Sequence, residues 1–173
     1  MFFILASISM TCGIWAQPTD GAEQPRILNA PELREKPWFY SIESAMANPM
    51  EVYKLSLSDQ KIKTVPDELF QLKNLQVLNL NGCKLKVLPE TLGDLANLEM
   101  LSLFDNKLRT LPVNIRKLRH LEVLYLGGNK LTEIPVWIGG MGKLRILDIS
   151  RNPITPLELM QIGRLMPKLQ LTY

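Results

Sequence analysis

The sequence contains one histidine and two cysteines among its 173 residues. Two cysteines are too few for a disulfide framework or a thiolate metal site, and a single histidine removes most histidine-based catalytic and metal constellations. The formal net charge is only +3, which does not indicate a nucleic-acid partner. We therefore expect no cofactor, no metal ion and no nucleic acid.

The composition itself is that of an ordinary folded domain. Hydrophobic residues make up 46% of the chain and charged residues 21%, so the sequence is too apolar for a disordered class. The length fits one domain with a core of its own.

The first 16 residues are uncharged and mostly apolar. They are fewer than the roughly 20 residues that span a bilayer, so no integral membrane span is expected. A signal peptide over residues 1–16, cleaved after the small Ala16, suits them best, although no lysine or arginine follows Met1. A lipid anchor at Cys12 and an uncleaved N-terminus remain alternatives.

The next two segments precede any regular pattern. Residues 17–40 are rich in proline and lack hydrophobic periodicity, which predicts a flexible leader. Residues 41–51 contain a short helix signal, because Ser41 suits an N-cap and Asn48-Pro49 a stop. We expect this segment to cap whatever follows.

From Val52 the chain repeats every 23 residues, and a fifth unit begins at Leu144. Seven positions of the unit (1, 4, 6, 11, 14, 18 and 21) are apolar in each of the first four units, and position 15 is always proline. No single unit of this size can bury its apolar face, so the units must stack. The four complete units are 52–74, 75–97, 98–120 and 121–143.

The pattern within a unit predicts a strand, a turn and an irregular return. Positions 4 and 6 alternate inward around an outward position 5, as in a strand, and the recurrent proline disfavours a continuous α-helix on the return. Position 9 forms a ladder of side chains that can turn inward and bond the backbone of the turn. Its members are Gln60, Cys83, Asn106, Asn129 and Asn152.

This pattern, LxxLxLxxNxLxxLPxxIxxLxx, resembles the leucine-rich-repeat family in its short subtype. The resemblance covers residues 52–157 and implies an α/β fold, a right-handed solenoid with a concave parallel sheet and 3₁₀ or polyproline returns. It also implies binding of proteins or other large ligands. The lead-in Ser44–Val52 is similar to that of small bacterial members of the family.

The last unit departs from the pattern. Glu158 replaces the proline, and helical spacing begins at Pro156, followed by a possible strand over Leu169–Leu171. A solenoid needs covers over its open ends. We expect residues 158–173 to form the C-terminal cap.

Positions 3, 5, 7 and 8 of each unit should face the concave side. Outward aromatic side chains next to an apolar stripe, with charged residues around them, resemble a binding hot spot, although apolar residues at position 3 also simply favour strands. The candidate ligand-binding residues are Met100, Phe104, Val123, Tyr125, Asp105, Arg145, Asp148 and Arg151.

Basic residues repeat at positions 10 and 12. They could meet an anionic glycan, a membrane surface or an acidic protein, but lysine is ordinary here and we predict a solvated edge. We call this set the basic ridge: Lys61, Lys63, Lys84, Lys86, Lys107, Arg109 and Lys130.

The carboxylates are scattered over open faces, so no enzyme is expected. The sequence predicts a monomeric, exported bacterial binding module that holds a protein, or alternatively a glycan, on its concave sheet. Export would place it in the periplasm, at the cell surface or in the medium. A cytoplasmic adaptor of the same fold, with the N-terminus retained, is the alternative.

Overall fold

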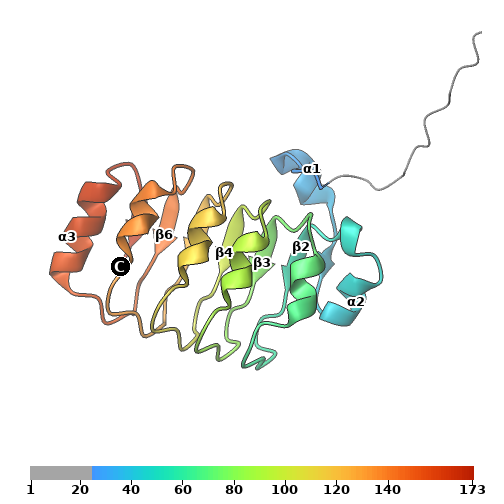
Figure 1. The fold of residues 1–173 in the computed structure, drawn as a ribbon, viewed down its shortest axis with the longest axis horizontal. Coiled ribbons are helices and arrows are strands. Elements are labelled where there is room, and N and C mark those ends of the chain that lie inside the picture. Colours follow the sequence, from blue (N-terminus) through green and yellow to red (C-terminus); the bar gives the residue numbers. More distant parts are fainter. Residues whose placement is uncertain (1–24) are drawn as a thin grey trace, which may run out of the picture.

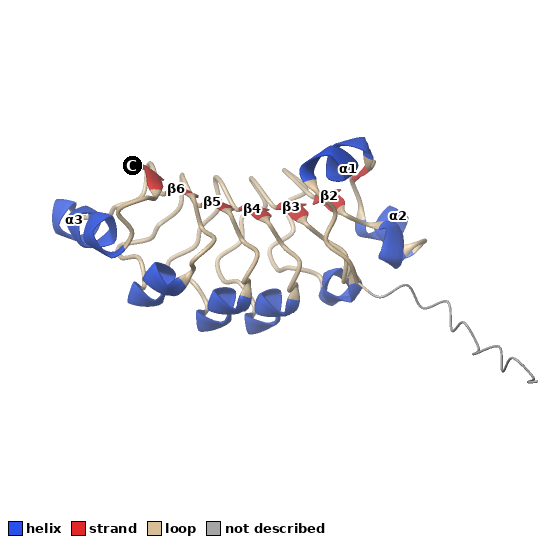
Figure 2. Ribbon diagram, turned by 90° about the horizontal axis from the view of Figure 1, so that it is seen from above, coloured by secondary structure: helices blue, strands red, loops and turns tan. Residues whose placement is uncertain are grey.

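The computed structural model describes residues 25–173, and its centre is one parallel sheet of seven short strands. The strands follow one another in sequence order, so each pairs only with its neighbours along the chain (Figures 1 and 2). They are β1 (Trp38–Phe39), β2 (Lys54–Ser56), β3 (Val77–Asn79), β4 (Met100–Ser102), β5 (Val123–Tyr125), β6 (Ile146–Asp148) and β7 (Gln170–Thr172).

The return segments form five-residue 3₁₀ helices on the side away from the strands (Figure 2). Each begins directly after the repeated proline, whose ψ between 138° and 151° is not helical. A proline lacks the N–H that a helix interior requires, so the helix does not continue past it towards the strand. They are η2 (Asp67–Gln71), η3 (Glu90–Asp94), η4 (Val113–Lys117) and η5 (Val136–Gly140).

The core lies between the strands and the 3₁₀ helices and runs through every repeat as one cluster. The register places the central leucines of the strands side by side, and none of them is exposed to solvent. This column consists of Leu55, Leu78, Leu101, Leu124 and Leu147. Stacking thus buries what no single unit could bury.

Both ends of the stack are covered. At the N-terminal end, helix α2 (Ile42–Met46) begins at the N-cap Ser41 and buries Ala45, and the 3₁₀ turn η1 (Pro49–Glu51) follows. At the other end, helix α3 (Pro156–Leu165) buries Ile162, and β7 adds the last strand to β6. The strand expected at 169–171 lies one residue further along, at Gln170–Thr172.

The flexible leader expected over 17–40 differs from the structure from residue 25 onward. Residues 25–40 contain helix α1 (Ala30–Glu35) and strand β1, which pairs with β2. Leu28 is buried, and its N–H and C=O bond the side-chain amide of Gln76 at 2.8 and 2.9 Å. Helix α1 buries no side chain of its own, so the Leu28–Gln76 contact is the physical reason why this segment is ordered against the solenoid. The signal peptide expected at 1–16 lies outside the described residues.

Within residues 25–173, no helix has the length and apolar character needed to cross a membrane.

Candidate ligand-binding face

The concave side of the sheet is open over β4, β5 and β6. Met100, Val123 and Ile146 lie next to one another in register, and each is partly exposed. Towards the N-terminal end the same row is closed: Lys54 is buried and its Nζ donates to the carbonyl of Arg34 at 3.1 Å. In Figure 2, α1 lies on the strand side of the molecule, next to β2. The exposed apolar stripe therefore belongs to the later repeats.

Phe104, directly after β4, is held from several sides. Its backbone N–H donates to Oδ1 of Asn81 at 2.8 Å, and its ring lies so close to Gly127 that a Cβ there would collide with Cε2. The guanidinium of Arg151 lies 4.6 Å from the ring centroid, a cation–π contact. Arg151 also pairs with Asp105 at 2.9 Å. The aromatic ring is therefore fixed before any ligand arrives.

Tyr125 and Asp148 stand side by side in β5 and β6, one strand beyond Ser102. Both are partly exposed on the concave side. Oδ1 of Asp148 accepts the backbone N–H of Ser150 at 2.8 Å, so one carboxylate oxygen is engaged with the turn. Together with Phe104, these residues adjoin the apolar stripe; we call Met100, Phe104, Val123 and Tyr125 the concave patch.

Arg145 does not join Asp105 and Arg151. It precedes β6 whereas Arg151 follows it, and parallel strands begin at one edge of a sheet and end at the other. Its nearest acid is Glu122, with 3.9 Å between Nε and Oε2. The two arginines occupy positions 2 and 8 of the repeat, on either side of the strand, so the pattern itself could have separated them.

Glu99 lies at this starting edge, immediately before β4. Burial raises the pKa of its carboxyl above the ordinary value of 4.5, and the nearby negative charge of Glu122 raises it further. A hydrogen bond from Gln76 and the charge of Lys143 act in the opposite direction. In residues 25–173, no three His, Cys, Asp or Glu side chains are placed to hold a metal ion.

The ladder at position 9 holds the turns in place. Nδ2 of Asn106 donates to the carbonyls of Leu80 and Leu103 at 2.8 and 2.9 Å, and its Oδ1 accepts the N–H of Leu85 at 2.9 Å. Asn129 and Asn152 make the equivalent bonds in the next two units.

The other two ladder positions behave differently. Cys83 is fully buried, and its Sγ donates to the carbonyl of Leu57 at 3.1 Å. Burial raises the pKa of this thiol, which disfavours the reactive thiolate. Gln60 was expected to turn inward, but it is exposed and its Nε2 donates to the carbonyl of Tyr40. No repeat precedes its unit, so the N-terminal cap takes the place of one.

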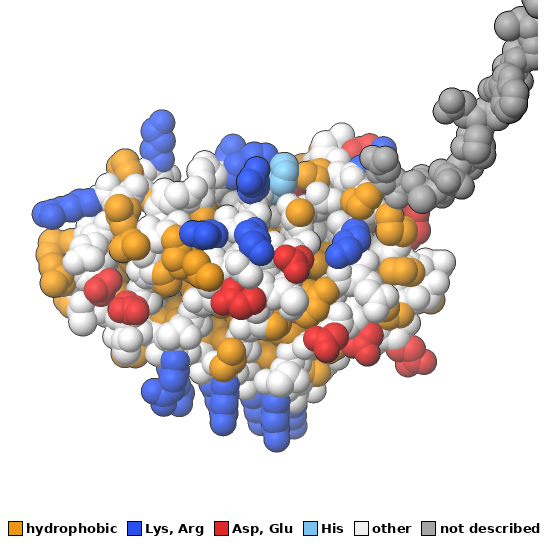
Figure 3. All heavy atoms as spheres, in the orientation of Figure 1, with side chains coloured by type: hydrophobic (Ala, Val, Ile, Leu, Met, Phe, Trp, Pro, Cys, Tyr) orange, Lys and Arg blue, Asp and Glu red, His pale blue; other side chains and the backbone are white. Residues whose placement is uncertain are grey.

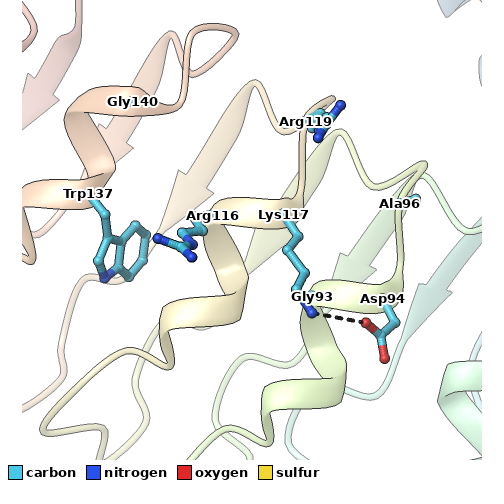
Figure 4. Close-up of a pocket in the computed structure, with 8 residues that line it drawn as sticks. All are labelled: Gly93, Asp94, Ala96, Arg116, Lys117, Arg119, Trp137 and Gly140. Atoms are coloured by element: carbon cyan, nitrogen blue, oxygen red, sulfur yellow. Dashed lines mark ion pairs between the residues drawn. The ribbon is translucent and has the colours of Figure 1, made fainter.

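A shallow hollow lies on the convex side, between the 3₁₀ helices η3, η4 and η5 (Figure 4). The volume of the hollow is about 820 Å³. Within it, Lys117 forms an ion pair with Asp94 at 3.8 Å, and Arg116 lies beside Trp137. Trp137 is partly buried and packs against the core. The return segments approach closely here, because a Cβ at Gly93 would collide with the Asn114 carbonyl.

Two residues that hold Phe104 in place, Asn81 and Gly127, were not predicted from the sequence. Both occupy position 7, where the other units carry Ser58, Phe104 and Ser150. The available signal was the smallness of Gly127 beside the aromatic Phe104 of the preceding unit.

A family model for the leucine-rich repeat matches residues 51–108 and 112–154, more than half of the chain. The chain belongs to the leucine-rich-repeat family. The resemblance found in the sequence is thereby confirmed, as is the α/β solenoid fold. Domains of this family are typically non-enzymatic modules for protein interaction. Among curated proteins, none matches the chain.

Solved structures of other leucine-rich-repeat proteins are similar. One from Leptospira interrogans is 38% identical with a TM-score of 0.69, covering 78% of this chain and 34% of that one. The Arabidopsis thaliana receptor kinase HAESA, in complex with the peptide hormone IDA and the co-receptor SERK1, is 29% identical with a TM-score of 0.54, covering 68% and 20%. Internalin C2 of Listeria monocytogenes shares the fold at 23% identity and a TM-score of 0.60, covering 72% and 52%. The chain thus spans about a third of the Leptospira protein.

Proposed function

We propose that this leucine-rich-repeat protein is a non-enzymatic binding module that holds a protein ligand on its concave sheet. The observation that carries the proposal is the fixed ring of Phe104 beside the open stripe of Met100, Val123 and Ile146. A preformed aromatic anchor loses little conformational freedom on binding, and aromatic side chains and arginine dominate binding hot spots. The HAESA structure, with its bound peptide hormone, supports a protein or peptide ligand.

Two charged side chains define the border of this face at the ends of the strands. Asp105 and Arg151 are both exposed and already paired with each other, so they would orient a ligand more than add affinity. The central contacts would come from the concave patch.

The experiment is a comparison of two variants against identified ligands. Proteins captured from the native cell envelope by the immobilised chain would be identified, purified and titrated against it. We expect Phe104→Ala with Tyr125→Ala to weaken binding more than about tenfold, or about 1.4 kcal/mol. The control is Val136→Ser, which removes a 75% exposed apolar side chain from the convex side. Equal affinity of the double variant and the wild type would reject the concave face.

We further propose that the protein is exported by a bacterium, with residues 1–16 as a signal peptide. The mostly apolar, uncharged N-terminus and the similarity to the Leptospira protein support this. The intact mass of the protein from fractionated native cells tests it. A species beginning at Gln17 outside the cytosol is expected, a diacylglycerol-modified Cys12 would indicate a tethered receptor, and full-length protein in the cytosol would favour the adaptor.

A further inference from the structure

The basic ridge forms one continuous edge of the molecule, beyond the ends of the strands. All seven of its side chains are exposed, and they come from four successive repeats. Figure 3 shows lysine and arginine side chains projecting in a row from the lower edge. The row contains two cations in each of the first three repeats and Lys130 in the fourth.

The charges of the basic ridge are not neutralised within the part of the chain that the structure describes. Five ion pairs occur among residues 25–173, and none includes a ridge residue. The acids nearest in sequence are Asp59 and Asp105, each two residues before a ridge lysine, and Glu133, three residues after Lys130. Of these, Asp105 is paired with Arg151 at 2.9 Å. The positive potential of the edge is therefore available to a partner.

The backbone below these side chains is rigid. The N–H of Lys107 donates to the Leu85 carbonyl at 2.7 Å, and that of Lys130 donates to the Leu108 carbonyl at 2.8 Å. The asparagine ladder holds the neighbouring amides. Neighbouring strands lie about 4.8 Å apart, so the four lysines at position 10 span roughly 14 Å in a regular row.

Two shallow grooves run between the ridge side chains. One is lined by Lys63, Lys84, Lys86 and Lys107. The other continues through Lys107, Arg109 and Lys130, with Val87 and Thr110 between them. Lysine stems are apolar while their ammonium groups reach water, so such grooves can receive a thin chain whose charges meet the ammonium groups on both sides.

We propose that the basic ridge binds a linear anionic polysaccharide that carries sulfate or carboxylate groups along its length. Each sugar of an extended polysaccharide advances the chain by a distance of the same order as the strand spacing, so its charges can match the row. Solvation alone explains isolated lysines, but seven unpaired cations along two grooves form a directional surface.

Other polyanions fit the ridge less well. It contains no Phe, Tyr or Trp on which a nucleic-acid base could stack. Val87, 71% exposed, is its one large apolar side chain, which is too little to insert into a membrane interface. A folded acidic protein would need a central apolar or aromatic anchor, and the ridge offers none.

The test uses heparin as a sulfated probe, with dextran as a neutral probe, and measures affinity by isothermal titration. Heparin should bind, dextran should not, and the affinity should fall at least tenfold between 50 and 200 mM salt, since the contact is electrostatic. Lys84→Glu with Lys107→Glu should weaken heparin binding at least tenfold. Lys73→Glu with Lys168→Glu, which makes the same change in net charge at exposed positions elsewhere, should change it less than twofold.

Three results would overturn the proposal. They are the absence of heparin binding, an equal loss in both charge variants, and tighter binding of polyglutamate or of phosphatidylglycerol vesicles than of heparin. The concave double variant Phe104→Ala with Tyr125→Ala should bind heparin normally, so failure of the ridge and failure of the concave site are distinguishable.

Discussion

The side chain of Asn106 shows how one residue joins two repeats. It bonds carbonyls of its own unit and of the preceding one, and it accepts the amide of Leu85. Cys83, at the equivalent position one unit earlier, keeps a donor to the preceding unit but is a weak acceptor. The thiol of Cys83 and the amide of Asn106 therefore both donate a hydrogen bond to a carbonyl of the preceding unit, but only the amide also accepts one strongly.

We expect Asn106→Ala to lower the free energy of unfolding by about 2–4 kcal/mol, because it leaves several buried backbone groups without a partner. Asn106→Cys should cost less, since the thiol can donate as Cys83 does. Urea denaturation of both variants measures the difference. Equal losses would mean that the donated bond contributes nothing to stability.

The carboxyl of Glu99 makes the stability of the protein depend on pH. Its pKa is raised in the folded chain, so the folded state binds a proton more tightly than the unfolded state does. The contribution of Glu99 is therefore most favourable below pH 4.5 and declines as the pH rises through 4.5 and the higher folded pKa. At neutral pH the ionised group is a net cost.

Glu99→Gln should accordingly be more stable than the wild type at pH 7, with the advantage shrinking as the pH falls towards 4. Thermal melts across this range follow the effect. Glu68→Gln, at an exposed position on η2, serves as the control. An advantage for Glu99→Gln that did not change with pH would contradict the assignment to ionisation.

At the scale of elements, α1 depends on contacts that lie far away in the sequence. The capping box Asn29–Glu32 begins the helix, but the anchor of the segment is Leu28, held by Gln76.

Gln76→Ala should release residues 25–36 from β3 and increase their amide hydrogen exchange, with a loss of about 1–3 kcal/mol in stability. Hydrogen-exchange mass spectrometry of this segment, with the exposed Gln71→Ala as control, would show it. Unchanged protection would mean that β1 alone holds the segment.

The strands and the return segments could be predicted because the same 23-residue pattern recurs in each repeat. The alternating positions identified β2 to β6, and the prolines identified the 3₁₀ helices. Helix α1 was missed because its six residues have no apolar stripe, although Asn29-Ala30-Pro31-Glu32 carried a readable capping signal. A local signal of that kind says that a helix can form, but not that a distant glutamine will hold it.

At the scale of the whole molecule, stacking divides the surface into areas with different properties. The concave side is closed at its N-terminal end and open over β4 to β6, and the basic ridge adjoins the edge where Phe104 lies. The residues of the concave patch could be assigned to the concave side from positions 3, 5 and 7 of the repeat. The contacts of Arg151 with Phe104 and Asp105 could not be predicted, because they join side chains of units that are two repeats apart and depend on the side-chain conformation.

The hydrogen bonds between Leu28 and Gln76 also make the two ends of the stack differ in their resistance to a pulling force. Hydrogen bonds between strands run along the axis of the stack, so tension on its two ends acts along them. At the N-terminal end the Leu28–Gln76 bonds reach past β1 and β2 to the residue before β3, whereas the backbone pairing of β7 is with β6 alone. Under load the stack should therefore open from the β7 end, and each 23-residue repeat released would lengthen the chain by up to about 80 Å.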